Sequence, residues 1–299
     1  MEMVGQRKWN RRKAALVFLL PALIGLLVFQ LLPMAASVVI SFSDWDLLSK
    51  WTDINFIGWD NYSEVFKDDK SYTSFKNVFL FLIGYMPLIA VLGTLFAVLL
   101  NRKLRGIRFY RAALFVPVIT SWVAVSIVWR WLLNGQSGLI NFLLSKVGIH
   151  GPIWLQDDFW AMVAIIAVTI WKDIGFVSII LLAGLQDIAD DYYEAADLDG
   201  ASAWRKLTGI TVPMLSPTLF FVVSISLINS FQLFDQVLIM TNGGPAGATS
   251  TIVEQVYKNA FQFNKMGFAA AQSWVLFVII FAVTMLMQVL QRRWVVYDR

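Results

Sequence analysis

The sequence predicts an all-α integral membrane protein with about six transmembrane helices. Of its 299 residues, 58% are hydrophobic and only 15% are charged, and the mean hydropathy is +0.66. Its apolar runs reach roughly 20 residues, which at about 1.5 Å per residue is enough to cross about 30 Å of hydrocarbon. Such a composition leaves too few polar residues to coat a soluble domain, so the expected solvent is the bilayer.

The apolar runs are expected to be helices, because a backbone in lipid must satisfy its own hydrogen bonds. The alternating strands of about ten residues that build membrane barrels are not found in the sequence. The six predicted spans are approximately 14–41, 77–101, 112–133, 159–185, 213–240 and 268–290. No repeat or long linker interrupts them, so residues 1–299 are expected to form a single transmembrane domain.

The first apolar run has a second interpretation, a cleaved signal peptide. It follows a cluster of basic residues, and Met34-Ala35-Ala36-Ser37 could serve as a cleavage site. However, the run is longer than the usual apolar region of about 7–15 residues and continues through Ile40, which favours a retained anchor.

Basic residues gather in alternate loops and predict the orientation. They precede the first span, connect the second span to the third, and follow the last: Arg7, Lys8, Arg11, Arg12, Lys13; Arg102, Lys103, Arg105, Arg108, Arg111; Arg292, Arg293, Arg299. The first-to-second connection is acidic: Asp44, Asp46, Asp53, Asp60, Glu64, Asp68, Asp69. Since short cytoplasmic loops are rich in Lys and Arg, both termini are expected to be cytoplasmic.

Composition excludes several kinds of site within this chain. There is no cysteine and a single histidine, His150, so a disulfide framework, a histidine metal cluster and a Ser-His-Asp triad are excluded. The net charge of +4 resides beside the apolar runs, so no nucleic-acid partner is expected. No Gly-x-x-x-x-Gly-Lys-Ser/Thr motif occurs, and the chain is therefore not expected to hydrolyse ATP.

The cytoplasmic segment 186–213, between the fourth and fifth spans, predicts two short helices with a bend. Asp191 and Glu194 have the spacing of a capping box, and Gly200 is the expected breaker because glycine accepts a positive φ. The second piece, Ala201 to Ile210, carries an apolar stripe suited to a groove on a partner: Trp204, Leu207, Ile210. Pro213 is expected to open the next span.

The pattern Glu194-Ala195-Ala196, Asp199-Gly200-Ala201, then Ile210 and Pro213 resembles the EAA loop of bacterial ABC importer permeases. Ala189 stands where many relatives have proline, and Leu207 where phenylalanine is common, but the apolar stripe remains. The resemblance implies a type I importer permease fold, in which this loop couples to an ATPase through Glu194, Ala195, Ala196, Asp199, Gly200, Leu207, Ile210 and Pro213.

Weaker motifs in the same order along the chain resemble the carbohydrate-uptake branch, in particular the first permease of a heterodimeric pair. They are Phe56-Ile57-Gly58 with Asn61-Tyr62, Arg111 with Phe115 and Pro117, Trp129-Arg130-Trp131, Gly138-Leu139 with Asn141, Trp171-Lys172, and Thr241-Asn242-Gly243-Gly244-Pro245.

The resemblance implies the following partners: a second permease, two ATPase subunits that hold ATP and Mg, and an extracytoplasmic solute-binding protein. No cofactor is expected on this chain. The implied cargo is a mono- or oligosaccharide, with glycerol-3-phosphate or a polyol as the alternative.

Two other classes stay open at this point. Asp173 and Asp235 inside spans keep an ion-coupled secondary transporter open, and a membrane enzyme or scaffold is the third class.

Polar residues inside two spans are candidates for a substrate pathway. Ser226, Asn229 and Ser230 share one helical face, with Gln232, Asp235 and Gln236 further along. Polar groups at bilayer depth are costly unless they face a cavity or a partner, and Ser and Asn also join helices to each other.

In the fourth span, Trp171, Asp173 and Phe176 are the candidates. The adjacent Lys172 and Asp173 need separate partners unless the helix bends at Gly175, and pairing with a sister permease is the alternative role. The sequence Asn242-Gly243-Gly244-Pro245 predicts an external turn, either a plain connection or part of a binding-protein dock.

Overall fold

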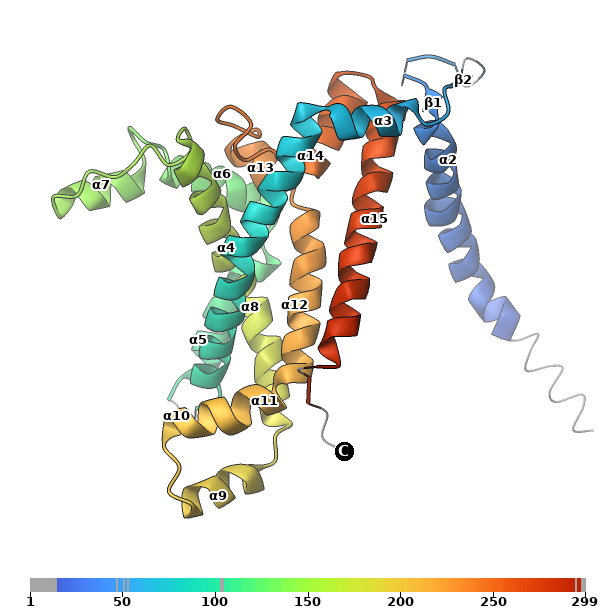
Figure 1. Cartoon of the computed structure of the whole chain (residues 1–299). Helices are drawn as coiled ribbons and strands as arrows, with labels where there is room; N and C mark the ends of the chain where they lie inside the picture. The colour runs from blue at the N-terminus through green and yellow to red at the C-terminus, as the bar shows by residue number, and fades with distance from the viewer. Residues whose placement is uncertain are drawn as a thin grey trace, which may run out of the picture. The chain divides into compact units, whose positions relative to one another are not determined.

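The computed structural model describes residues 15–46, 48–50, 52, 54–102, 105–293 and 295–296, and it is mainly helical (Figure 1). Within these residues, four helices are long and apolar enough to cross a membrane, and the number reaches six if each of two bent pairs is one span. This confirms the predicted fold class. The basic tail before the first span, together with Asp53, Lys103 and Arg299, lies outside the described residues.

The chain divides into two compact units, residues 1–66 with 256–274, and residues 67–255 with 275–299. The first unit contains the helix Ala15–Ser41, whose last parts are the π-helical η1 (Leu27–Leu31) and α2 (Leu32–Ser41). Strand β1 (Ser43–Asp44) pairs antiparallel with β2 (Asn55–Phe56). The Asn61 side chain, on α3 (Asp60–Lys67), donates to the Ser41 and Ser43 carbonyls at 3.0 and 2.9 Å and so fixes the end of the helix against β1.

The second unit holds the remaining elements, and α4 and α8 form its centre. Asp68 caps α4 through the Ser71 amide, and Asp157 caps α8 through the Phe159 and Trp160 amides. The elements are α4 (Asp69–Leu100), α5 (Ile107–Ile119), α6 (Trp122–Leu132), α7 (Leu139–Lys146), α8 (Asp158–Gln186), α9 (Asp190–Leu198), α10 (Ala203–Lys206), η3 (Leu207–Thr211), α11 (Val212–Met214), α12 (Ser216–Phe231) and α13 (Asp235–Met240). Helix α14 (Ile252–Tyr257) and α15 (Met266–Gln291) cross the boundary between the units, and η4 (Lys258–Gln262) belongs to the first.

Glycine allows close helix contact in the core of the second unit. A Cβ on Gly175 of α8 would collide with the Leu114 carbonyl of α5. Helix α8 runs unbroken through Gly175, which admits the backbone of a neighbouring helix, so Lys172 and Asp173 need separate partners.

The predicted third span, 112–133, is not one helix. It consists of α5 and α6, whose axes differ by 98°. Pro117 has no N–H to donate within α5, and the Ser121 hydroxyl accepts from the Val123 amide at 3.3 Å, which starts a new helix. The polar pair Thr120-Ser121 thus interrupts an apolar run in which hydropathy predicted one continuous helix.

The predicted fifth span, 213–240, is also interrupted. It contains α12 and α13, separated by Gln232, Leu233 and Phe234. Pro213 does not open this span, because it lies within α11, and α12 begins after a bend of 66° with Pro217 in its first turn.

The loop before this span forms two short helices, as predicted, but the capping box is wrong. Helix α9 begins at Asp190, and its N-cap residue Ala189 makes no side-chain cap. The second helix begins at Ala203, where the Ser202 hydroxyl accepts from the Arg205 amide at 3.3 Å.

Within the second unit, α9, α10 and α11 lie at one end of α8 and α12, and α13 and α14 lie at the other end (Figure 1). The segment after α15 returns to the first of these ends, where the Val296 amide donates to the Ser216 hydroxyl at 2.9 Å. The short-helix loop and the segment that follows the last span therefore share one end of the unit.

Candidate functional site

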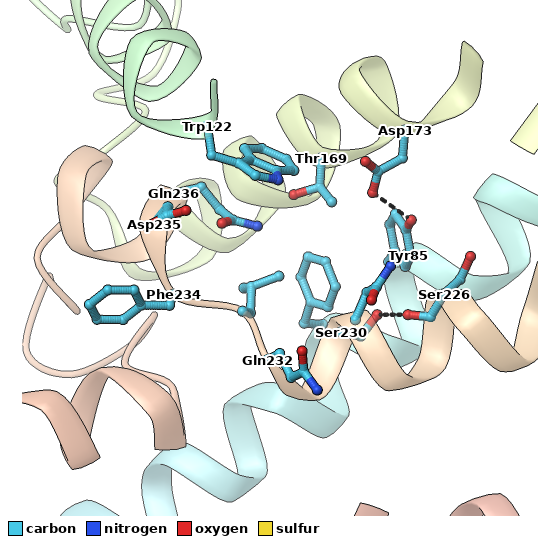
Figure 2. Close-up of a pocket in the computed structure, with 13 residues that line it drawn as sticks. Tyr85, Trp122, Thr169, Asp173, Ser226, Ser230, Gln232, Phe234, Asp235 and Gln236 are labelled. Carbon is cyan, nitrogen blue, oxygen red and sulfur yellow. Dashed lines mark hydrogen bonds between the residues drawn. The ribbon is translucent and has the colours of Figure 1, made fainter. Parts of the chain in front are cut away.

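A polar cavity of about 270 Å³ lies among the long helices of the second unit (Figure 2). Helices α4, α6, α8 and α12, the break between α12 and α13, and the start of α13 each contribute side chains. The lining residues are Phe81, Tyr85, Trp122, Thr169, Asp173, Ser226, Asn229, Ser230, Gln232, Leu233, Phe234, Asp235 and Gln236. The surface therefore combines hydroxyl, amide and carboxylate groups with aromatic rings.

A second hollow of about 390 Å³ shares part of this wall. Tyr85, Trp122, Asp173, Ser226 and Asn229 line both spaces, and the second extends along the break between α5 and α6. The two spaces thus form neighbouring parts of one polar region inside the unit.

The structure separates Lys172 from Asp173 by giving each its own partner, as the sequence analysis required. Asp173 accepts a hydrogen bond from the Tyr85 hydroxyl at 2.9 Å. Lys172 donates to the Pro117 and Val118 carbonyls, both at 3.1 Å.

Lys172 stabilises the bend between α5 and α6. The carbonyl groups at a helix end carry partial negative charge, which an ammonium group complements. Lys172 adds a donor to the Val118 carbonyl and to the Pro117 carbonyl, which also accepts from the Thr120 amide at 3.3 Å. The same ammonium lies 4.9 Å from the centre of the Trp122 ring, at the start of α6. One buried cation therefore contacts both sides of the break and supports Trp122, whose ring lines the cavity.

Four of the predicted pathway residues meet in the first cavity, namely Asp173, Ser226, Asn229 and Ser230. Phe176 lines the second hollow. Trp171 lines neither of these two spaces, and instead its ring packs edge-on against Trp129 with centroids 5.4 Å apart. The helical spacing of the fifth span correctly placed its polar residues on a shared face.

Tyr85, Trp122 and Thr169 also line the cavity, but they were not predicted from the sequence. Their positions depend on which helices adjoin, and a single sequence does not give that arrangement. One signal was present for Trp122: the polar pair Thr120-Ser121 after Pro117 indicates a helix start directly before it.

The loop containing the EAA-like pattern keeps its bend at Gly200, whose φ is +72°. The Gly200 and Ala201 amides donate to the Asp197 and Ala196 carbonyls at 3.1 and 2.9 Å, which closes α9 with the hydrogen bonds of a glycine C-cap. A Lys206–Asp197 ion pair at 2.6 Å and a Tyr193–Thr211 hydrogen bond at 3.0 Å join the two short helices. The loop is therefore an ordered pair of helices.

The predicted loop residues are not equally exposed. Glu194, Ala195, Asp199 and Gly200 are exposed, whereas the remaining four are half-buried: Ala196, Leu207, Ile210, Pro213. The large apolar side chains that project furthest are Leu198 and Trp204, exposed by 91% and 72%. The stripe predicted from spacing thus has Trp204 outside and Leu207 and Ile210 partly covered.

At the opposite end, the turn at Asn242-Gly243-Gly244-Pro245 belongs to a tied loop. The Asn77 amide of α4 donates to the Gly247 and Ser250 carbonyls at 2.7 and 2.9 Å. The buried Glu254 carboxylate accepts from the Ser250 hydroxyl at 2.7 Å and packs against the Cα of Gly243. These contacts join the loop to α4.

Comparisons with known proteins identify the family. Residues 89–296 match the family described as binding-protein-dependent transport system inner membrane component. The chain is 35% identical to the probable ABC transporter permease protein YesP of Bacillus subtilis over 292 residues, which are 95% of this chain and 92% of that protein. It is 33% identical to the lactose transport system permease protein LacF of Rhizobium radiobacter over 270 residues, 88% of this chain and 89% of that protein.

The fold also matches a solved structure. A chain in the crystal structure of a bacterial alginate ABC transporter, in complex with an alginate pentasaccharide-bound periplasmic protein, superposes with a TM-score of 0.84 at 23% identity, covering 96% of each chain. The membrane-spanning helices and the family match over residues 89–296 support the family of ABC importer permeases that the EAA-like loop resembles. This chain belongs to the family of inner-membrane permease components of binding-protein-dependent ABC transport systems.

Proposed function

We propose that this chain is a transmembrane permease subunit of an ATP-driven importer that moves a sugar into the cell. Sugar-transport permeases such as the lactose permease protein are among its relatives. The observation that carries the proposal is a cavity with the chemistry of a sugar site, inside the helices of a permease family member. Sugars offer many hydroxyl groups, and they need neutral donors and acceptors together with aromatic faces.

The polar face of α12 is our proposed substrate surface. Ser226, Asn229 and Ser230 provide hydroxyl and amide groups, and Trp122 supplies an aromatic ring. Ser226 and Ser230 are buried, and the Ser230 hydroxyl donates to the Ser226 carbonyl at 2.7 Å. All three residues nevertheless line a cavity, which supports a role in the pathway beside the alternative of joining helices.

The loop from α9 to α11 is our proposed coupling element. Leu198 and Trp204 would enter an apolar groove on the ATPase, with Leu207 and Ile210 as the inner part of the contact. Glu194 is exposed and would form an ion pair or hydrogen bond there. Because hydrogen bonds join the two short helices, a movement of the ATPase would pass through them to α12 as a unit.

The proposed assembly contains a second permease, two ATPase subunits carrying ATP and Mg, and a solute-binding protein outside the membrane. The solved alginate transporter, which shares the fold, was crystallised with its periplasmic protein. ATP binding would close the ATPase pair and turn the permeases outward, and hydrolysis would restore the inward state. Both termini would then be cytoplasmic, on the same side as the loop.

Gly200→Asp tests the coupling role. We expect the variant to reach the membrane at wild-type levels but to lose sugar uptake, since the new side chain would enter the ATPase contact. Gly148→Asp is the matched control, because Gly148 has a φ of +78° and open space around it, as Gly200 does, but lies in another loop. Normal uptake by Gly200→Asp cells would contradict the coupling role.

The partners provide a separate test. Gentle purification of the tagged chain should recover a second permease and a nucleotide-hydrolysing subunit. Uptake that survives ATP depletion and collapses with an uncoupler would instead identify an ion-coupled transporter and refute the proposal.

A further inference from the structure

The charges around the two polar hollows are unequal. Asp173 and Asp235 contribute carboxylates to the first cavity, and Asp173 also lines the second. Figure 2 shows them on opposite sides of the view, with Asp173 next to Tyr85 and Asp235 next to Phe234. Among the residues that line these two spaces, Lys172 is the only basic one.

The Lys172 ammonium is not presented to a solute. The residue is only 5% exposed, and its Nζ donates to the Pro117 and Val118 carbonyls at 3.1 Å each. The Trp122 ring covers it further, at 4.9 Å. An anionic group in the cavity would therefore meet two carboxylates and a cation that is already occupied.

The polar groups that remain suit a ligand that donates hydrogen bonds. Asp173 is held by the Tyr85 hydroxyl at one carboxylate oxygen, Oδ2, and an ionised carboxylate can accept further hydrogen bonds. Sugar hydroxyl groups and protonated amino groups are such donors. A carboxylate, sulfonate or phosphate on the ligand would be repelled by these two carboxylates.

We infer that the cavity formed by this chain accepts neutral or amino-bearing sugar units and rejects anionic ones, among them uronic acids and polyol phosphates. The inference rests on the proposed function, because it assigns the class of substrate to the same cavity. It separates this chain from the alginate transporter that shares its fold, whose cargo is an acidic polysaccharide. It also argues against glycerol-3-phosphate, the alternative cargo.

The absence of cysteine from the sequence allows the charge preference to be measured directly. Asn229→Cys introduces one thiol into the cavity wall, and Ser226→Cys gives a second reporter. Membranes containing the assembled transporter are treated with a cationic or an anionic methanethiosulfonate, 2-(trimethylammonium)ethyl or 2-sulfonatoethyl. The rate at which the cationic reagent modifies the thiol is divided by the rate for the anionic reagent. This ratio is then divided by the same ratio for free 2-mercaptoethanol, so that only the effect of the site remains.

We expect the corrected ratio to favour the cationic reagent by at least about tenfold, which corresponds to about 1.4 kcal/mol. Adding Asp173→Asn should lower it several-fold, because this replacement keeps the shape and removes the charge. Ser137→Cys is the control, since Ser137 lies in a separate hollow without acidic lining residues. Its corrected ratio should stay near one and should not respond to Asp173→Asn.

Three outcomes would overturn the inference: a corrected ratio near or below one at both cavity positions, a ratio unaffected by Asp173→Asn, or no labelling at either position by either reagent. An uptake panel then separates the inference from the proposed function. Cells with this transporter as their only sugar importer receive neutral oligosaccharides, amino sugars, alginate oligosaccharides and glycerol-3-phosphate. Uptake of anionic members would refute only the inference, whereas no uptake of any member by an assembled complex would refute the proposed function.

Discussion

Lys172→Met should destabilise the bend between α5 and α6. The replacement keeps an unbranched apolar chain but removes the ammonium from the Pro117 and Val118 carbonyls and from the Trp122 ring. A hydrogen bond to a charged group contributes roughly 1.5–3 kcal/mol, and a shielded cation–π contact about 2 kcal/mol. Part of this is offset, because methionine lacks the cost of burying a charge.

We expect a net loss of about 2–3 kcal/mol in unfolding free energy. For a chain of this size, that loss should lower the melting temperature by roughly 3–5 °C. The assay is thermal unfolding of the purified transporter in detergent, followed by the uptake rate in cells, which should also fall because Trp122 loses its support.

Lys146→Met is the matched control for this prediction. Lys146 also lies over an aromatic ring, with its Nζ 5.1 Å from the centre of Phe142, but it is an exposed residue at the end of α7. Its replacement should change the melting temperature by no more than about 1 °C, because exposed contacts of this kind are weak. If the Lys172→Met variant had the same melting temperature as the Lys146→Met control and transported sugar at the wild-type rate, the role of Lys172 at the bend would be refuted.

Two further substitutions test the packing and the cavity. Gly175→Ala should lower the melting temperature and the yield of folded protein, since its Cβ would collide with the Leu114 carbonyl. Gly25→Ala is the control and should lower neither, because nothing lies within 4 Å of a Cβ at that position. Equal melting curves for the two variants would argue against close contact between α5 and α8. Tyr85→Phe removes the 2.9 Å hydrogen bond to Asp173, and we expect initial sugar uptake to fall about tenfold at equal membrane levels, the effect of about 1.4 kcal/mol. Wild-type uptake by Tyr85→Phe would show that this hydrogen bond does not position the carboxylate for transport.

Much of the architecture follows from local rules that a single sequence contains. The long helices were predicted from apolar length, and a predicted start lies close to the observed one where the capping carboxylate stands next to the apolar run. At Asp157 the cap stands next to the apolar run, so the predicted start, 159, is close to the observed one, Asp158. At Asp68 the cap stands well before the apolar run. Helix α4 therefore begins earlier than its hydropathy indicated, because its first turns consist mainly of polar residues.

The cavity could be predicted only in part. The shared face of Ser226, Asn229 and Ser230 follows from helical geometry within one segment. The Tyr85–Asp173 hydrogen bond joins residues from two helices far apart in the chain, and nothing in either segment specifies the other.

Sequence motifs also proved to include structural residues: the Asn141 side chain donates to the Gly135 and Pro152 carbonyls and accepts from Trp154.

The two failures of the span prediction fall at the cavity itself. The break at Thr120-Ser121 borders the second hollow, and the break at Gln232-Leu233-Phe234 lines the first. Non-helical backbone at membrane depth leaves carbonyl groups without helical partners, so it is tolerated where it lines a cavity and where other groups satisfy it.

Both breaks meet this requirement through a distant side chain. Lys172 donates to the Val118 carbonyl before the first break, and the Thr251 hydroxyl donates to the Leu233 carbonyl inside the second at 2.7 Å. A continuous helix in either place would turn its backbone inward and present only side chains to the cavity. The interruptions place Trp122 and Asp235, the first residues of the new helices, in the wall of the cavity. The same interruptions that defeat a prediction from hydropathy thus create the site, and the two supporting donors are needed because the site lies inside the membrane span.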